Sequence, residues 1–366
     1  MEISTGVEQT LFADLQQRCM DALFDAEFPE NGSFSLLRKG DRSYWYYQTY
    51  EPASARDKAR RSSKYVGPAD DPVIQARVET FRRGKGGYRE RRALVRALTS
   101  LGLVSPPRLA GDLIESMWKS GLFRLRGVLV GTAAYQTYPG LLGLRFPAGA
   151  LMTFDLDFAQ FHSIAISVED EMAPVLETLK AIDPSFRGVP HASDQRMSTA
   201  YVNREGFRVE FLTPNVSKDD YQSRPALMPT LGGAAAQPLR FLDFLIHEPV
   251  WSVVLHRAGV PVLVPAPERY AIHKLIVAIE RRQDGRTTSK AGKDIVQAET
   301  LIVGLAETGR GLDLGSAWAE AWERGPAWRE DLDAGRGRLS SAAREALRLA
   351  VAAFALGERR SLDQLW

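Results

Sequence analysis

Two aspartates alternate with large apolar residues in the segment 153–158, which has the sequence Thr-Phe-Asp-Leu-Asp-Phe. On a β-strand, side chains two positions apart point to the same face, so Asp155 and Asp157 share one face and the apolar residues share the other. The pattern therefore predicts a strand with a core face and an acidic face. At a rise of about 3.3 Å per residue the two α-carbons lie about 6–7 Å apart, which lets both carboxylates bind one divalent cation.

A third acid lies in a similar pattern further along the chain. Glu210 is flanked by apolar residues in the second of two alternating runs, which an Asn-Arg-Glu-Gly turn at 203–206 joins into a predicted hairpin. Three clustered carboxylates are typical of a site that holds Mg²⁺ together with substrate phosphates. Upstream, the apolar run 128–130 ends at Gly131 and Thr132, a turn in which backbone N–H groups can approach a phosphate.

In this order, the residues resemble the DNA polymerase β-like nucleotidyltransferase superfamily. Its pattern is an apolar residue, a glycine and a small residue, then two alternating acids, then a third acid. The segment 267–278, Arg281 and the pair Lys293-Asp294 look like the helical half of bacterial nucleotidyltransferase-fold proteins related to abortive-infection toxins. The resemblance covers residues 127–305. The gap between Thr132 and Asp155 holds 22 residues and is longer than the common family spacing.

The resemblance implies an enzyme that transfers a nucleoside monophosphate from an NTP to an acceptor and releases pyrophosphate. Asp155, Asp157 and Glu210 would bind Mg²⁺ or Mn²⁺ and carry the catalysis. The residues that it places on the nucleotide are Gly131, Thr132, Lys274 and Asp294. For two of these residues an ordinary structural interpretation stays open. Lys274 could be a helix lysine whose aliphatic stem covers apolar surface. Asp294 could be an acid that complements the dipole at the start of a helix. A non-catalytic nucleic-acid-binding or toxin–antitoxin-type protein with the same fold is the alternative function.

Positive charge is concentrated near the N-terminus. The net charge is only +2, but residues 38–96 hold 16 Lys and Arg against 7 Asp and Glu, a local charge of +9 that leaves the rest of the chain at −7. Tyrosines and a tryptophan gather at 44–50. Basic and aromatic residues together favour contact with RNA, such as tRNA, over a merely solvated helix face. The residues expected on the phosphate backbone are Arg82, Arg83, Lys85, Arg89, Arg91 and Arg92.

The order of the expected elements divides the chain into three parts. Residues 1–105 form an N-terminal basic and aromatic module, with a hairpin that turns at Gly40-Asp41. Residues 106–247 alternate helices and strands, which predicts an α/β or α+β nucleotidyltransferase core with a mixed sheet. Residues 248–366 begin with a short hairpin and continue as a mainly helical C-terminal domain.

Composition supports a soluble globular chain, with 45% hydrophobic and 25% charged residues. The single cysteine, Cys19, forms no internal disulfide, which fits a reducing cytoplasm. The N-terminus lacks the basic head and apolar run of a signal peptide, and no stretch approaches 18 apolar residues. We therefore expect a cytoplasmic protein without a membrane span. The five histidines show no metal-ligand spacing, so zinc is not expected.

Overall fold

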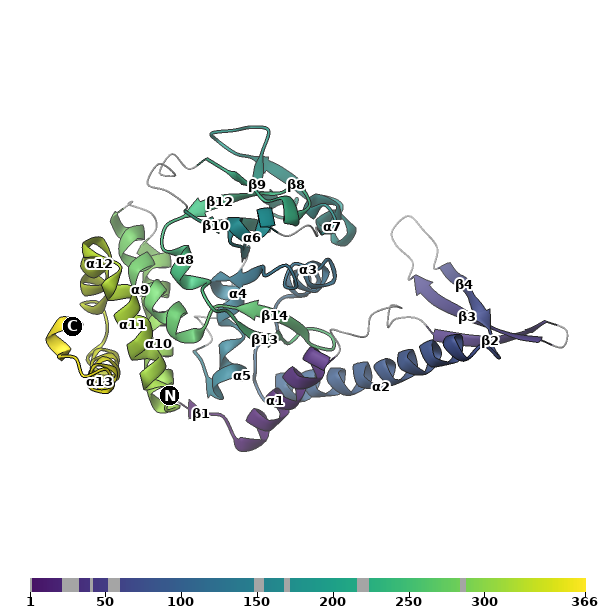
Figure 1. The fold of residues 1–366 in the computed structure, drawn as a ribbon, viewed down its shortest axis with the longest axis horizontal. Helices are drawn as coiled ribbons and strands as arrows, with labels where there is room; N and C mark the ends of the chain where they lie inside the picture. Colours follow the sequence, from purple (N-terminus) through teal and green to yellow (C-terminus); the bar gives the residue numbers. More distant parts are fainter. Residues whose placement is uncertain are drawn as a thin grey trace.

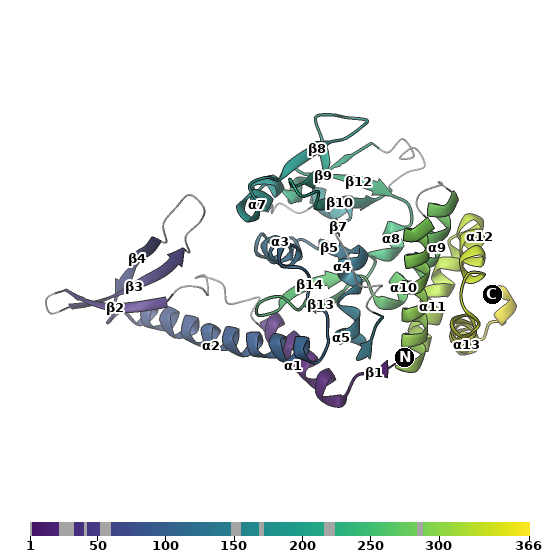
Figure 2. The same ribbon diagram turned by 180° about the vertical axis from the view of Figure 1, so that it is seen from behind.

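The computed structural model describes residues 2–21, 33–39, 42–51, 60–147, 155–167, 172–215, 224–283 and 288–366. Figure 1 shows a body of helices around a central sheet, and an arm that projects from the body along one long helix. The view from behind in Figure 2 shows the same separation of the arm from the body. The body combines a mixed sheet with many helices, as the sequence predicts.

The central sheet has seven strands within the described residues. In chain order they are β5 (Val128–Val130), β7 (Asp155–Ala159), β8 (Arg187–Pro190), β9 (Ser198–Val202), β10 (Arg208–Pro214), β11 (Ala226–Leu227) and β12 (Ala235–Leu239). β10 runs parallel to β7 on one side. On its other side, its first half pairs with β9 and its second half runs parallel to β12. β9 and β10 form the predicted hairpin, and Gly206 in its turn has a φ of +84°.

One face of this sheet is packed into the core of the body. Leu156, Phe158, Val209 and Phe211 are fully buried on it, and the rings of Phe158 and Phe211 stack with centroids 5.7 Å apart. Because side chains alternate along a strand, the acids of β7 and β10 lie on the other face. The burial of the apolar positions therefore fixes which way the acidic positions point.

Helices and a hairpin complete the body. The helices are α3 (Arg108–Lys119), α4 (Gly131–Tyr135), α5 (Tyr138–Leu142), α6 (His162–Ser167), α7 (Val175–Ile182), α8 (Leu242–Leu245), α9 (Pro267–Gln283), α10 (Thr288–Glu307), α11 (Gly311–Glu323), α12 (Pro326–Arg336) and α13 (Ser341–Gly357). The hairpin consists of β13 (Val250–Val254) and β14 (Val260–Val264). Short 3₁₀ turns lie at Pro229–Leu231 and Leu362–Gln364. Among these helices, none is both long and apolar enough to cross a bilayer.

A single hydrophobic core joins the sheet to the C-terminal helices. It is continuous from Ala110 in α3 to Leu365 near the C-terminus. Trp318 of α11 is fully buried in it and donates a hydrogen bond from its indole nitrogen to the Leu365 carbonyl at 2.6 Å. The helical region is therefore packed directly onto the sheet-containing region.

The long segment between Thr132 and Asp155 contributes to this packing. It contains α5 and β6 (Leu144–Arg145), and β6 pairs antiparallel with β1 (Glu2–Ile3) at the N-terminus. Arg145 also donates a hydrogen bond at 2.5 Å to the buried carboxylate of Glu8 in α1 (Gly6–Asp21). Part of this long segment thus anchors the N-terminal helix.

The arm is built from β2 (Ser33–Lys39), β3 (Arg42–Glu51), β4 (Arg60–Pro68) and the long helix α2 (Pro72–Ser100). The three strands form an antiparallel sheet in chain order. The predicted hairpin corresponds to β2 and β3. Its predicted turn, Gly40-Asp41, lies outside the described residues. β4 was not predicted. Asp71 caps the start of α2, because its carboxylate accepts a hydrogen bond from the Val73 N–H at 2.8 Å.

Candidate active site

The three predicted acids lie on one face of the central sheet. In the parallel pairing of β7 with β10, Glu210 is directly opposite Asp157 and Arg208 is opposite Asp155. Paired positions on neighbouring strands point to the same face. Asp155, Asp157 and Glu210 are half-buried there, so the face is partly open to a ligand. Arg208 forms an ion pair with Glu210.

The environment of Asp157 disfavours its charged form. Burial, together with the negative charges of Asp155 and Glu210, raises the pKa of Asp157 to about 7, against the opposing effect of Lys274 and Arg281. Carboxylates that share a partly desolvated site cannot all ionise without cost. The nearby cations therefore do not fully offset burial and repulsion at Asp157.

Gly131 brings the backbone close to this cluster. Its φ is +66°, a left-handed conformation that glycine adopts readily. A Cβ at this position would lie 2.7 Å from an Asp157 carboxylate oxygen, Oδ2, so a larger residue would collide with the acid. The Gly131 carbonyl accepts a hydrogen bond from the Tyr270 hydroxyl at 3.0 Å. Next to it, Thr132 accepts a hydrogen bond from Lys293 Nζ at 3.1 Å.

Two cations from α9 converge on one acid from α10. Asp294 contacts Lys274 Nζ through Oδ1 and Arg281 Nη1 through Oδ2, each at 2.6 Å. Lys274 is 8% exposed and Asp294 2%. Lys274 is therefore not an ordinary surface lysine, and Asp294 lies inside α10 rather than at its start. Lys274 and Asp294 instead belong to a buried ion-pair network beside the acids.

The sequence did not assign Arg281 and Lys293 to the site. Both lie in the helical segments that carry the resemblance, Arg281 two helical turns after Lys274 and Lys293 directly before Asp294. Burial, and the neighbouring charge of Lys274, lower the pKa of Lys293. Lys274, Arg281 and Lys293 thus lie near the three acids, with Lys274 and Arg281 already paired to Asp294.

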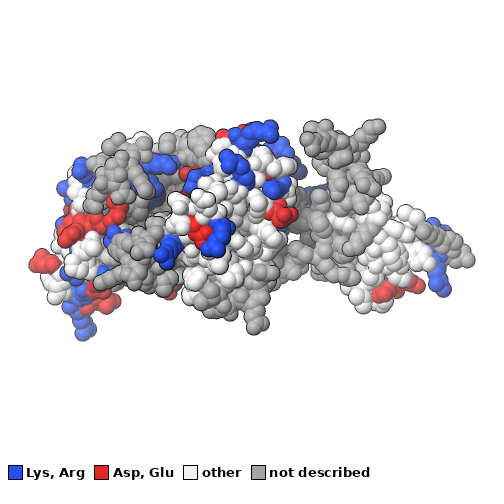
Figure 3. Space-filling view, turned by 90° about the horizontal axis from the view of Figure 1, so that it is seen from above, with Lys and Arg blue, Asp and Glu red and all other residues white. Residues whose placement is uncertain are grey.

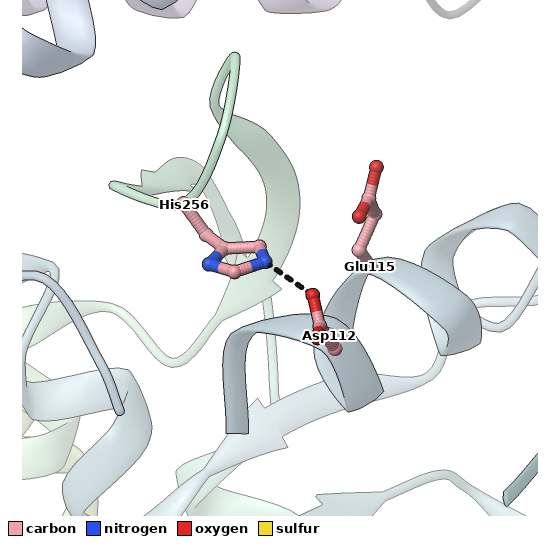
Figure 4. A group of neighbouring side chains, drawn as sticks. All are labelled: Asp112, Glu115 and His256. Carbon is pink, nitrogen blue, oxygen red and sulfur yellow. Dashed lines mark hydrogen bonds and ion pairs between the residues drawn. The ribbon is translucent and has the colours of Figure 1, made fainter. Parts of the chain in front are cut away.

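A second acidic group lies on α3. Among the described residues, Asp112, Glu115 and His256 are the one group of His, Cys, Asp or Glu side chains whose ligand atoms all lie within 4.8 Å of one another; the carboxylates of Asp155, Asp157 and Glu210 share a sheet face but are not all this close. Figure 4 shows the His256 ring facing Asp112, with Nε2 2.8 Å from Oδ1. Arg257 contacts both carboxylates, at 2.5 and 3.0 Å, and Lys119 contacts Glu115 at 2.8 Å. These residues could hold a metal, but cations already balance both acids, and the network ties α3 to the loop after β13.

The predicted nucleic-acid residues all lie on α2, with different exposure. Arg82, Arg89 and Arg92 are exposed. Arg91 is only 6% exposed, because it lies on the side of α2 that is buried along with Val95 and Leu98; its prediction as a surface phosphate contact is wrong. For Arg83 and Lys85 the helix is described, but their side chains are outside the described part of the structure.

A protein-family model described as a nucleotidyltransferase matches residues 108–323, more than half of the chain. The chain belongs to this nucleotidyltransferase family. The matched part of the nucleotidyltransferase contains the three acids, Gly131 and the ion-pair network of α9 and α10, and it leaves the arm unmatched. No curated protein and no solved structure matches the chain.

Proposed function

We propose that this nucleotidyltransferase transfers a nucleoside monophosphate from an NTP to an acceptor hydroxyl or phosphate, with release of pyrophosphate. The observation that carries the proposal is the strand register that sets Glu210 opposite Asp157, with Asp155 on the same face. The acids lie beside a glycine turn and three cations. Phosphoryl transfer needs such opposed charges, because catalysis consists mainly of positioning and charge stabilisation.

The donor set suits Mg²⁺ or Mn²⁺. Carboxylate oxygens are the ligands that these cations prefer, and Asp155, Asp157 and Glu210 would hold the metal. The repulsion and burial that raise the pKa of Asp157 to about 7 are a cost that a divalent cation would offset. When bound, the metal neutralises charge on the transferring phosphate.

The remaining side chains have separate roles in this proposal. The backbone N–H groups at Gly131 and Thr132 bind the phosphates, and Lys274 and Lys293 neutralise their charge. Asp294 is a positioning residue, because its two oxygens fix the ammonium of Lys274 and the guanidinium of Arg281. Glu210 orients or deprotonates the acceptor.

RNA is the acceptor class that the charge distribution favours. The basic stretch 38–96 carries +9 in a chain whose remainder is acidic, and it lies in the arm, outside the family match. A non-catalytic protein would not need all three acids on one sheet face. Their common orientation therefore supports an enzyme over a fold-only binding protein.

Transfer of label from each α-³²P-labelled NTP to total RNA, with Mg²⁺ or Mn²⁺ present, tests the proposal. We expect labelled RNA with at least one NTP, and at least a 100-fold lower rate for Asp157→Asn. Asp333→Asn, at an exposed acid of α12 that pairs with Arg336, is the matched control and should act as the parent does. Full activity of Asp157→Asn, or no transfer from any NTP, would overturn the proposal.

A further inference from the structure

Three tyrosines lie together on one face of the arm sheet. Tyr44 and Tyr46 come from β3, and Tyr65 comes from β4. The Tyr65 ring centroid lies 6.0 Å from that of Tyr44 and 5.6 Å from that of Tyr46. Tyr65 is 52% exposed. We call these three residues the tyrosine face.

The opposite face of the arm sheet packs against helix α2. Phe81 of α2 packs against Phe34 and Tyr47, with ring centroids 5.0 and 5.7 Å away. The Arg82 guanidinium lies over the Trp45 ring at 5.1 Å. Trp45 and Tyr47 alternate with Tyr44 and Tyr46 along β3, so the tyrosine face points away from the helix. The packing of the arm therefore does not require tyrosine rings on its outer face.

Exposed arginines continue from the sheet along α2. Arg82, Arg89, Arg92 and Arg96 are all exposed. Their spacings of seven, three and four residues place them within an arc of about 80° on a helix that turns 100° per residue. We call these four residues the arginine stripe. Arg82 contacts Trp45, so the stripe begins at the sheet and runs from there toward the body.

The arm is set apart from the proposed catalytic site. Figures 1 and 2 place it at the opposite end of the molecule from helices α9 to α13. In Figure 3, Lys and Arg side chains lie at the outer end of the arm and acidic side chains lie along one edge of it, while basic and acidic side chains are mixed over the visible face of the body. Residues 38–96, which make up most of the arm, carry a charge of +9, which is complementary to a polyanion.

We infer that the arm binds single-stranded nucleic acid, with bases stacked on the tyrosine face and the phosphate backbone following the arginine stripe. Because Arg82 lies over Trp45 on the α2 side of the sheet, a bound strand would pass around the sheet edge from the tyrosine face to the arginine stripe. Every unpaired base offers a π-face to the tyrosines, and every phosphate offers a charge to the arginines. A duplex keeps its base faces covered, so it cannot use the tyrosines. The inference rests on the proposed function only in making the bound strand the acceptor, since the binding itself needs neither NTP nor metal.

Fluorescence anisotropy of a 5′-labelled 12-nucleotide single-stranded RNA, titrated with the full chain without NTP or metal, tests the inference. Stacking contributes about 1–3 kcal/mol per base, so Tyr65→Leu should weaken binding about five-fold to about 150-fold. Tyr65→Phe keeps the ring and should bind as the parent does. Tyr88→Leu, the same substitution at a half-buried position of α2, controls for a general loss of structure. A duplex of the same sequence should not respond to Tyr65→Leu.

The salt dependence of binding tests the arginine stripe separately. Replacing Arg89, Arg92 and Arg96 by alanine should reduce the log–log salt slope of binding by about 2, at about 0.7 for each lost phosphate contact. No binding by the parent at low salt, or equal affinity of Tyr65→Leu and Tyr65→Phe, would overturn the inference and leave the tyrosine face as a protein contact. The two proposals fail separately, because Asp157→Asn should lose transfer while it keeps full RNA binding.

Discussion

Replacing Asp157 by asparagine should stabilise the metal-free protein while it abolishes transfer. The pKa of Asp157 rises from 3.8 to about 7 through burial and the charges of Asp155 and Glu210. That is about three pKa units, which at about 1.4 kcal/mol each sets a ceiling of about 4 kcal/mol on the cost of the charge. The side chain is half-buried and water screens part of the repulsion, so we expect a gain of about 1–2 kcal/mol in the free energy of unfolding.

The sign of this effect depends on pH. The unfolded chain ionises Asp157 above about pH 4, whereas the raised pKa keeps the folded acid protonated up to about pH 7. Folding therefore loses stability as the pH rises from 4 to 7, and the whole cost is present above 7. The asparagine variant avoids this cost, so its advantage over the parent should be full at pH 8 and vanish near pH 4.

Urea unfolding in EDTA at pH 4.5, 6 and 8 measures the difference. The Asp333→Asn control should show no pH-dependent advantage, because Asp333 is exposed and paired with Arg336. An Asp157→Asn variant that is less stable than the parent at pH 8, or whose stability differs from the parent's by the same amount at every pH, would refute the reasoning that burial and repulsion destabilise the charged Asp157.

Three further substitutions test other parts of the structure. Asp294→Asn leaves Lys274 and Arg281 without their shared carboxylate, and the free energy of unfolding should fall by about 3 kcal/mol in a chemical melt; an unchanged melt would contradict the network. Gly131→Ala adds a Cβ at a φ of +66°, and should cost about 1–3 kcal/mol and most of the transfer rate; parent-like kinetics would speak against the close backbone approach. Gly87→Ala adds a Cβ that would meet only Arg91 Nη1, at an ordinary contact distance of 3.7 Å, and should raise the melting temperature through a gain of up to about 1 kcal/mol; a lower melting temperature would show that the helix needs this glycine.

Local patterns predicted the pieces of the site but not their contacts. Alternation in the segments 153–158 and 207–212 identified both acidic strands, because one face of each is buried in the core. The pairing of Glu210 with Asp157 depends on register between strands that are far apart in the chain. No local propensity encodes that register, so only the family resemblance suggested that the three acids belong to one site.

Burial explains where sequence reasoning failed. Arg91 belongs to a basic run like its neighbours, yet the packing of α2 against α1 buries its position. The contact of His256 with Asp112 joins residues 144 positions apart, which no spacing rule for metal ligands detects. The tyrosine face likewise appears only once β4 brings Tyr65 beside β3. Each of these features is decided by tertiary packing rather than by neighbours in the sequence.

The central claim is that the three acids of β7 and β10 work together in nucleotide transfer, and Glu210 tests it most directly. Pyrophosphate release can be measured for the parent, for Glu210→Gln and for Glu205→Gln, a matched control at an exposed turn residue of the same hairpin. We predict that Glu210→Gln loses at least 100-fold in rate while Glu205→Gln stays at the parent level. Parent-level pyrophosphate release by Glu210→Gln would contradict the account.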